Sequence, residues 1–252
     1  MKHILFTALL FLCLATMNQT QARRNRKLNL TTYNIHHGLG MDDSLDYKRI
    51  ADLFREAKSD DVAVQEVDSV TQRIQGRYSL GEIAKESKMH ALFAPAISFQ
   101  GGKYGVGILS RRKPISWHYI PLPGREEARV LLVAEFKNYV VACTHLSLTE
   151  RDLLESISLI VIEARKWQKP FLLMGDLNAE PDSEFYRVMS RHFTFLNRPD
   201  EPTFPSQRPN ICIDHIAVFN ANADRVELLD TQVGRSIASD HCPLHARVRI
   251  AR

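Results

Sequence analysis

The chain has 252 residues, of which 44% are hydrophobic and 25% are charged, and its formal net charge is +4. This length allows one or two buried cores, and because no linker, repeat or low-complexity tract divides the chain, we expect a single domain. Without Lys2 and the four basic residues between positions 23 and 27, 28 basic residues remain against 29 acidic ones. This near-neutral charge of the rest of the chain argues against a protein that binds nucleic acid through a strongly basic face.

The start of the chain is typical of a secretory signal peptide. Lys2 precedes an apolar run over residues 4–16, and Ala22 ends a stretch with the small residues of a cleavage site. The run is shorter than the roughly 20 apolar residues that a membrane-spanning helix needs. We therefore expect no stable membrane insertion and a secreted or periplasmic protein that consists of a signal peptide (1–22), a basic segment (23–27) and one domain (28–252).

Short apolar runs along the rest of the chain predict β-strands. These runs cover residues 28–35, 61–65, 104–109, 128–136, 139–144, 171–174, 211–218 and 246–250. Most of them are apolar at successive positions, which indicates strands that are covered on both faces.

Helix signals lie between these runs. Ser44 is placed to cap a segment over residues 47–57 that has apolar residues at helical spacing, and Ser79 with Glu82 has the pattern of a capping box.

Two further helices are expected in the second half of the chain. Thr149 and Asp152 open a long apolar stripe that ends before Pro170, and either Asp182 or Ser183 begins another helix. Because strands outnumber helices and the helices are interspersed among them, we expect stacked sheets with helices on the outside.

Three cysteines remain in the expected mature chain, Cys143, Cys212 and Cys242. An exported protein could pair two of them. Each one lies in an apolar segment, however, so we expect buried free thiols.

Polar side chains interrupt or follow several of the predicted strands. They are Glu66, His145, Asp176, Asn178, Asp214, Asp240 and His241. Burying such groups singly would cost several kcal/mol each, because each would lack a partner. The pattern therefore predicts that they cluster, with one another and with an ion.

The acidic residues in this set indicate which ion. Asp176 and Asn178 are two residues apart and point to the same side of an extended segment. Oxygen ligands such as Glu66, Asp176 and Asp240 suit Mg²⁺ or Mn²⁺. Zinc is disfavoured because the sequence has no Cys-x-x-Cys pair.

The order of the polar motifs resembles a known family. The chain contains "YNIHHG", "QEVD", "THL", "GDLNAEP", "IDHI" and "SDHCPL" in this order and over nearly its whole mature length. In this it resembles the endonuclease/exonuclease/phosphatase superfamily. The resemblance implies an α+β fold, a four-layer αββα sandwich in which two packed, mostly antiparallel sheets carry helices on their outer faces, with the site at one end of the sheets.

The resemblance also implies roles for particular residues. It makes Glu66 the principal metal ligand, with Asn34 and Asp240 nearby. It makes Asp176 and Asn178 the residues that orient the attacking water and the phosphate. It makes His241, held by Asp214, a general base or a phosphate-stabilising imidazole, and it makes His145 a contact of the scissile phosphate. Tyr104 and Arg129 are further expected contacts of this phosphate, and Arg125 is the alternative to Arg129.

Two adjacent histidines stand next to Asn34 in this pattern. Strand alternation places Asn34 and His36 on one side and His37 on the other. The resemblance makes Asn34 the functional residue of this stretch. His36 is then a candidate substrate contact, and His37 is expected to pack in a loop.

Three functions are compatible with the sequence. The first is a secreted Mg²⁺- or Mn²⁺-dependent phosphodiesterase or phosphatase acting on a phosphate-ester substrate. The second is a secreted nuclease with the same residues, for which nucleic acid would be the partner. The third is a catalytically silent binding module of the same fold. The fold does not choose among these substrates.

Overall fold

The computed structural model describes residues 26–251. The predictions of a signal peptide over residues 1–22 and of the basic segment's first residues lie outside this described part. Among the residues it does describe, no helix combines the length and the apolar character that crossing a membrane requires.

The described chain forms two six-stranded sheets that face each other. The first sheet has the order β11-β12-β1-β2-β4-β3 and the second β5-β6-β7-β8-β10-β9. The strands are β1 Arg26–Asn34, β2 Asp61–Ser69, β3 His90–Phe99, β4 Gly102–Ser110, β5 Ser116–Leu122, β6 Arg129–Glu135, β7 Val140–His145, β8 Phe171–Asp176, β9 Phe193–Phe195, β10 Asp214–Phe219, β11 Val226–Val233 and β12 Leu244–Ile250. Neighbouring strands are antiparallel except for the pairs β1–β2 and β7–β8.

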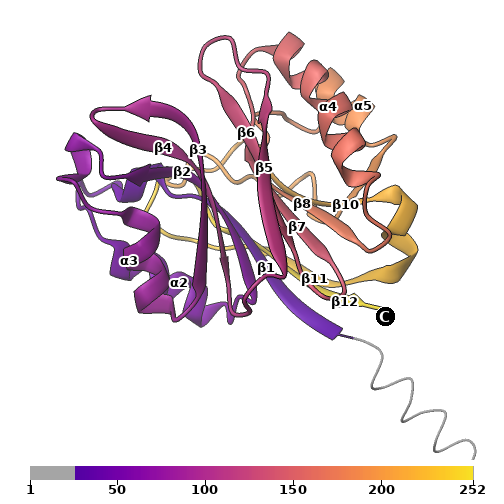
Figure 1. Ribbon diagram of the computed structural model, residues 1–252, viewed down its shortest axis with the longest axis horizontal. Coiled ribbons are helices and arrows are strands. Elements are labelled where there is room, and N and C mark those ends of the chain that lie inside the picture. The colour runs from indigo at the N-terminus through magenta and orange to yellow at the C-terminus, as the bar shows by residue number, and fades with distance from the viewer. Residues whose placement is uncertain (1–25, 252) are drawn as a thin grey trace, which may run out of the picture.

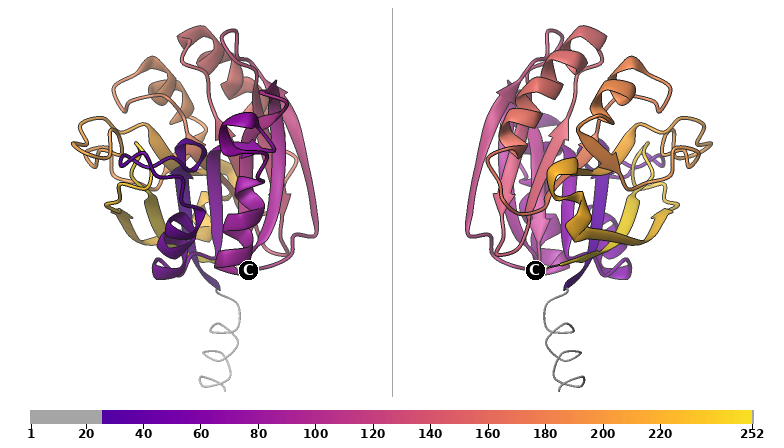
Figure 2. Two further views of the ribbon diagram at one scale, coloured as in Figure 1. Left: turned by 90° about the vertical axis from the view of Figure 1, so that its left-hand side faces the viewer. Right: turned by 90° about the vertical axis from the view of Figure 1, so that its right-hand side faces the viewer.

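Helices cover the outer face of each sheet, as Figures 1 and 2 show. The α-helices are α2 Tyr47–Glu56, α3 Ser79–Ser87, α4 Glu150–Ala164 and α5 Glu184–Met189, and the short 3-10 helices are η1 His36–Gly38, η2 Gln72–Ile74 and η3 Asn220–Arg225. α2 and α3 pack on the first sheet and α4 and α5 on the second. The expected four-layer αββα sandwich is therefore confirmed.

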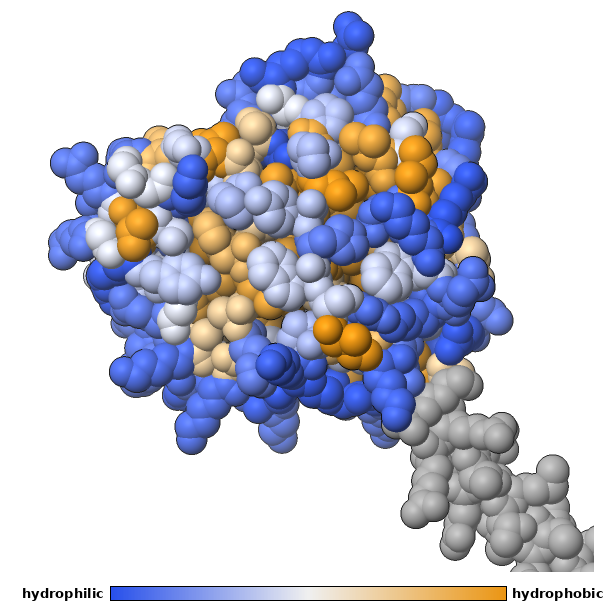
Figure 3. Space-filling model, viewed as in Figure 1, coloured by the Kyte–Doolittle hydropathy of each residue, from blue (hydrophilic) through white to orange (hydrophobic). Residues whose placement is uncertain are grey.

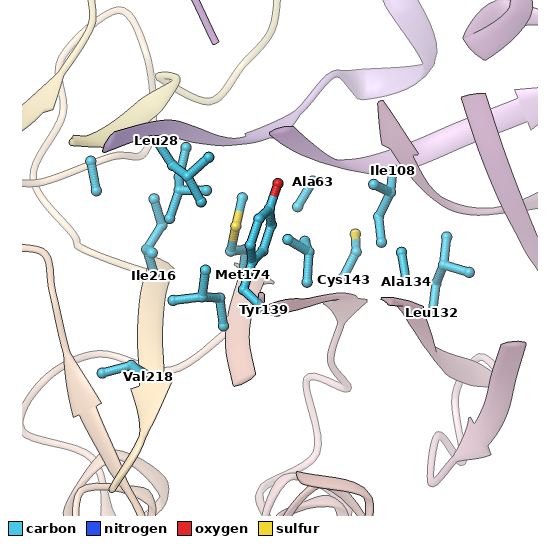
Figure 4. Packing of buried hydrophobic residues seen from close by; sticks show 14 of the residues in the cluster. Leu28, Ala63, Ile108, Leu132, Ala134, Tyr139, Cys143, Met174, Ile216 and Val218 are labelled. Carbon is cyan, nitrogen blue, oxygen red and sulfur yellow. The ribbon is translucent and has the colours of Figure 1, made fainter. Parts of the chain in front are cut away.

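An apolar cluster, separate from the residues packed between each sheet and its helices, fills the space between the two sheets. Figure 4 shows Leu28, Ala63 and Ile108 of the first sheet facing Met174 and Ile216 of the second. Each large apolar side chain that is fully buried contributes about 1.5–3 kcal/mol to folding. This packing makes the strands a rigid support for the polar residues at their ends.

The sequence predicted every inner strand of both sheets and missed β3, β5, β9 and β11, which are the edge strands. β5 and β11 are partly exposed and lack a continuous apolar run, and β9 has only three residues. In β5, for example, Trp117 and Tyr119 are exposed. β3 does have an apolar run over residues 91–97, which was overlooked. Figure 3 accordingly shows hydrophobic residues, in orange, along the middle of the face where β3 and β5 lie.

All four predicted helices are present, but two of the four predicted caps are wrong. Thr149 directly precedes α4, and the Ser183 side chain caps α5. α2, however, is capped by Asp46 rather than by Ser44, because the Asp46 carboxylate accepts a hydrogen bond from the Arg49 backbone N–H. Ser79 lies inside α3 and caps nothing, since its hydroxyl donates to a backbone carbonyl of β2.

Cys143, Cys212 and Cys242 are free and buried in the structure. The expectation of unpaired thiols is confirmed. Burial raises the pKa of the Cys143 thiol to about 12, so this thiol remains protonated.

Candidate active site

A cleft of about 680 Å³ opens at the end of the sandwich that is opposite Arg26, the first residue of β1. Most of the residues that the sequence singled out line this cleft: Glu66, Tyr104, Arg129, His145, Asp176, Asn178, Asp240 and His241. Asn34 and Asp214 are buried and contact residues of this set. The fold thus brings together side chains that are far apart in the sequence.

The second sheet supplies one row of the site through its strand register. Asp176, the last residue of β8, lies opposite His145 on β7 and opposite Asp214 on β10. β7 and β8 therefore end, and β10 begins, with a polar residue at the same level of the sheet. The interstrand hydrogen bonds fix these residues relative to one another, so their positions do not depend on loop conformation.

The first sheet supplies Glu66 through an irregularity in β2. The pairing of β2 with β4 shifts register between Val64 and Val67, and Glu66 has a φ of 57°. A non-glycine residue in this left-handed region costs about 1–3 kcal/mol. The bulge turns Glu66 toward the cleft, which is a common use of bulges beside functional sites. The sequence predicted a strand ending at Gln65 and gave no sign of this bulge.

Asn34 connects the two sheets. Its Nδ2 donates to Glu66 Oε1 at 3.0 Å and to Asp176 Oδ2 at 3.1 Å. The His36 backbone N–H donates to Asn34 Oδ1 at 3.1 Å, which fixes the orientation of the amide. The carboxylates of Glu66 and Asp176 therefore lie on either side of one amide nitrogen, close enough to share a hydrated cation.

The loop before β12 brings Asp240 to the same place through Ser239. The Ser239 hydroxyl donates to the Asn34 backbone carbonyl at 2.7 Å and lies 3.1 Å from Asp240 Oδ1. The His241 backbone N–H donates to the same hydroxyl at 3.2 Å. The sequence interpretation missed the positioning role of Ser239. The only signal for it was its place in the Ser-Asp-His run.

His241 lies between two carboxylates. Its Nδ1 is 2.9 Å from Asp214 Oδ2, and its Nε2 is 3.6 Å from Asp176 Oδ2. Burial opposes protonation of His241, but the Asp214 and Asp176 carboxylates outweigh burial and raise its pKa to about 10. The Phe204 ring packs at 4.7 Å from the imidazole. The imidazole is therefore held in one orientation, with Nδ1 facing Asp214.

His145 approaches Asp176 as well. Its Nε2 is 3.5 Å from Asp176 Oδ2. Burial lowers the pKa of His145 to about 4, although Asp176 acts in the opposite direction. Asp176 thus has two imidazoles and one amide around a single carboxylate oxygen.

Asn178 is held in a strained conformation just after β8. Its φ is 48°, its backbone N–H donates to Asp176 Oδ1 at 3.0 Å, and its Nδ2 donates to the Leu146 carbonyl at 2.9 Å. These bonds tie the end of β8 to the end of β7. Asn178 consequently presents a side chain of fixed orientation to the cleft.

Of the two arginines that competed in the sequence, Arg129 lines the cleft and Arg125 does not. Arg125 instead pairs with Asp152 and Glu155 near α4. Arg129 is 7% exposed, its Nη1 lies 2.9 Å from Glu127 Oε1, and its buried Nε has no hydrogen-bond partner. Glu127 was not singled out by the sequence.

Tyr104, the other residue with a weaker sequence signal, also lines the cleft. It is nearly buried, and burial raises the pKa of its hydroxyl above the usual range. Tyr104 therefore remains a neutral hydrogen-bonding group.

The strand-alternation argument for the two histidines was wrong. β1 ends at Asn34, and His36 and His37 lie in η1 with φ values of 46° and 47°. The His36 ring is hydrogen-bonded to the Leu39 carbonyl at 3.2 Å and is not among the residues that line the cleft. The part of His36 that serves the site is its backbone N–H, because this group orients Asn34.

The donor set fits a hard divalent cation. Burial raises the pKa of Glu66, and the carboxylates of Asp240 and Asp176 raise it further, although the Asn34 hydrogen bond acts against both. Carboxylates that repel one another in a buried cleft are stabilised by a cation. Their oxygen atoms are the ligands that Mg²⁺ and Mn²⁺ prefer, and the Asn34 Nδ2 holds two of these carboxylates in place.

A second group of possible ligands is formed by Asp176, Asp214 and His241, whose ligand atoms lie within 4.8 Å of one another. Here Asp214 and His241 are already hydrogen-bonded to each other. The side of Glu66, Asn34 and Asp240 is therefore the candidate place for a cation. The Asp214–His241 pair is interpreted as a separate unit next to it.

Comparison with known protein families gives one match. The model of the family described as Endonuclease/Exonuclease/phosphatase matches residues 31–241. This range includes the residues discussed above from Asn34 to His241. No curated protein matches the chain.

Solved structures share the fold at low sequence identity. An endonuclease/exonuclease/phosphatase from Beutenbergia cavernae has a TM-score of 0.74 and 21% identity, over 90% of this chain and 72% of that chain. A mannosyl-6-phosphatase from Bacteroides thetaiotaomicron has a TM-score of 0.68 and 16% identity, over 88% and 99% of the two chains. ANGEL2, a 2',3'-cyclic phosphatase, has a TM-score of 0.70 and 15% identity, over 89% and 95%.

Proposed function

The chain belongs to the endonuclease/exonuclease/phosphatase family, whose members hydrolyse phosphate esters with a divalent metal, and from this premise we propose that it is an exported, Mg²⁺- or Mn²⁺-dependent hydrolase of small phosphomonoesters or phosphodiesters. The observation that carries the proposal is the shared hydrogen bonding of Asn34 to Glu66 and Asp176. It joins the carboxylate side of the cleft to the imidazole side within one hydrogen-bonded network.

Glu66, with Asn34 and Asp240, would hold the cation. When bound, Mg²⁺ or Mn²⁺ supplies charge stabilisation of several kcal/mol for the phosphoryl oxygens. The remaining side chains of the cleft act on the water, the phosphate and the leaving group.

Hydrolysis forms a P–O bond to a water oxygen and breaks the P–O bond to the leaving alcohol. The Asp176 carboxylate accepts a hydrogen bond from the attacking water, and Asn178 next to it fixes the position of that water and of the phosphate. His241 and His145 flank Asp176. Their Nε2 atoms contact the phosphoryl oxygens as negative charge develops there.

Asp214 acts through His241. Its carboxylate holds the Nδ1 side of the ring and stabilises the protonated imidazole. This leaves Nε2 directed to the cleft, where it stabilises the phosphate or transfers a proton to or from the reacting oxygens. Positioned acid or base groups of this type contribute about 10² to 10⁴ in rate.

Nucleic acid is the alternative substrate. One neighbouring structure, ANGEL2, was solved in complex with adenosine-2',3'-vanadate, which contains a nucleoside. The near-neutral charge of the chain outside its basic start does not favour a polynucleotide. A silent binding module is disfavoured because the described cleft holds a full set of carboxylate, amide and imidazole groups.

The proposal is tested with p-nitrophenyl phosphate and its bis ester, in Mg²⁺, in Mn²⁺ and in EDTA, and with plasmid DNA and RNA over a series of salt concentrations. We expect turnover of the small esters that EDTA abolishes, and a fall of at least 10² in kcat for Asp176→Asn. Turnover that persists in EDTA, or an Asp176→Asn variant with normal kcat, would contradict the mechanism. DNA or RNA cleavage faster than turnover of both small esters would favour the nuclease.

Export is proposed on the apolar run at residues 4–16 and the stretch ending at Ala22. Expression of the full chain in a Gram-negative host, followed by fractionation and N-terminal sequencing, tests it. We expect a processed chain outside the cytoplasm that begins near Arg23. An unprocessed cytoplasmic chain would contradict the prediction.

A further inference from the structure

We propose that the cleft selects phosphate esters that carry one phosphate and a hydroxyl-rich leaving group, such as a sugar, and that an acidic rim makes this selection. The acidic rim consists of Glu127, Glu150, Glu180 and Asp182, which line the same cleft as Asp176 and His241. The inference rests on the proposed function and adds the substrate class to it.

The acidic rim comes from three separate segments. Glu127 precedes β6, Glu150 is the first residue of α4, and Glu180 and Asp182 lie between β8 and α5, just after Asn178. Glu150, Glu180 and Asp182 are exposed, so they meet the part of a substrate that extends out of the cleft. None of the four belongs to the cation and imidazole groups described above.

The cationic side chain in this region already pairs with carboxylates. Among the described residues that line the cleft, Arg129 is the only lysine or arginine, and Glu127 and Glu126 both pair with it. The Arg129 Nε is buried and without a partner. One guanidinium whose charge two glutamates balance can meet one anionic group of a substrate, and the described lining holds no second lysine or arginine for another phosphate.

Two arginines outside the cleft are likewise paired with carboxylates. Arg73 pairs with Asp68, and Arg198 pairs with Asp200. A substrate with several phosphates would place its additional charges against the acidic rim, where like charges repel. Proteins that bind polynucleotides do the opposite, because they meet successive phosphates with lysine and arginine.

The acidic rim also indicates what the leaving group must carry. Carboxylates accept hydrogen bonds and cannot donate them when ionised, so the group that they contact must be a donor. Hydroxyl groups meet this requirement without adding negative charge. The lining also includes the apolar side chains of Phe204, Ile211 and Leu148, the last of which is 71% exposed.

A cleft lined by both apolar side chains and carboxylate acceptors suits a ring that has carbon–hydrogen bonds on its face and hydroxyls at its edge. A sugar has this character. A nucleotide polymer does not, because its backbone places a phosphate at each step. We therefore expect a sugar monophosphate to be a better substrate than an oligonucleotide or an inositol polyphosphate.

The test compares kcat/KM for four substrates, which are a hexose 6-phosphate, p-nitrophenyl phosphate, phosphocholine and a short single-stranded DNA. We expect the wild type to prefer the hexose phosphate to the DNA at least tenfold at low salt. In the double variant Glu180→Gln/Asp182→Asn, the ratio of kcat/KM for the hexose phosphate to that for p-nitrophenyl phosphate should fall at least fivefold. Cleavage of the DNA should rise.

The matched control is Glu227→Gln/Asp230→Asn on β11, which removes the same charges from exposed positions that do not line this cleft. It should leave all ratios unchanged. An acidic-rim variant whose ratios equal those of the wild type would overturn the inference. So would a wild type that prefers phosphocholine, because the acidic rim would then recognise a cation rather than hydroxyls.

Preference for DNA at low salt would overturn the inference as well. The proposed function fails in a different way, namely by the absence of metal-dependent turnover of p-nitrophenyl phosphate by the wild type. The two failures are therefore distinguishable in the same set of assays.

Discussion

β2 carries a carboxylate toward each end of the sandwich, Asp61 fully buried and Glu66 partly buried, and the two differ in what surrounds them. At its start, Asp61 accepts hydrogen bonds from Ser110 at 2.6 Å and from Tyr139 at 2.8 Å. Near the site, Glu66 shares the Asn34 amide with another carboxylate and faces Asp240 as well. Burial alone therefore does not mark a functional carboxylate.

The difference lies in the partners. Hydroxyl donors satisfy Asp61 within the fold, so this end of the sandwich needs no ligand. At the site end, the carboxylates outnumber the groups that could neutralise them, and the chain accepts strain at Glu66 and Asn178 to hold them there. We expect changes at the site end to affect activity and changes at the Asp61 end to affect stability.

The largest expected effect is on catalytic activity, which should depend on the site end of the sandwich and not on the Asp61 end. Replacing His241 by Ala should lower kcat/KM for p-nitrophenyl phosphate by about 10² to 10⁴, because a positioned imidazole is lost. The matched change at the other end, Asp61→Asn, should leave kcat/KM within about twofold of the wild type. Equal losses of activity in the two variants, measured with both proteins shown to be folded by circular dichroism, would remove the distinction.

A smaller effect concerns the stability of the Asp61 end and its dependence on pH. Burial raises the pKa of Asp61 from 3.8 to about 6, although Ser110 and Tyr139 oppose this. The folded state therefore keeps a proton that the unfolded state has lost, and the contribution of this group to stability falls as the pH rises from about 4 to about 6.

Asp61→Asn removes this ionisation. Its free energy of unfolding relative to the wild type should increase by roughly 2–3 kcal/mol between pH 4 and pH 7. Urea titrations of both proteins at several pH values measure the difference, in which the titration of other groups cancels. A difference that is constant over this range would show that Asp61 titrates normally in the folded protein.

The smallest effect concerns the cation and the stability of the site end. Mg²⁺ at about ten times its dissociation constant should stabilise the wild type by about 1.4 kcal/mol, which is a rise in Tm of roughly 3–6 °C for a chain of this size. Glu66→Gln should lose most of this rise, since a principal ligand is weakened. In EDTA the same variant should be slightly more stable than the wild type, because it relieves repulsion from Asp176 and Asp240.

Asp61→Asn again provides the control, and its response to Mg²⁺ should equal that of the wild type. Thermal unfolding followed by circular dichroism, with and without EDTA, gives all of these values. If Glu66→Gln kept the full response to Mg²⁺, the cation would have to bind elsewhere, and Asp176, Asp214 and His241 would be the group to examine.

The strands and site residues that could be predicted share one property, which is that a local sequence pattern indicates them. Continuous apolar runs revealed the inner strands, and polar residues at the ends of those runs pointed to Glu66, Asp176 and Asp240. The edge strand β5 lacked such a run because solvent covers part of it. Similarly, the conformation of His36 could not be read from alternation, because the chain leaves the strand at Asn34.

By itself, the sequence determined that apolar strands end in acidic, amide and imidazole groups and that these groups suit a hard cation and a phosphate. The tertiary structure alone decided which of them meet. Asn34 and Asp176 touch because two sheets pack face to face, Ser239 holds Asp240 because a loop folds back over β1, and the acidic rim gathers from three separate segments. Such contacts depend on packing between distant segments, whereas a local pattern records only the burial of each segment.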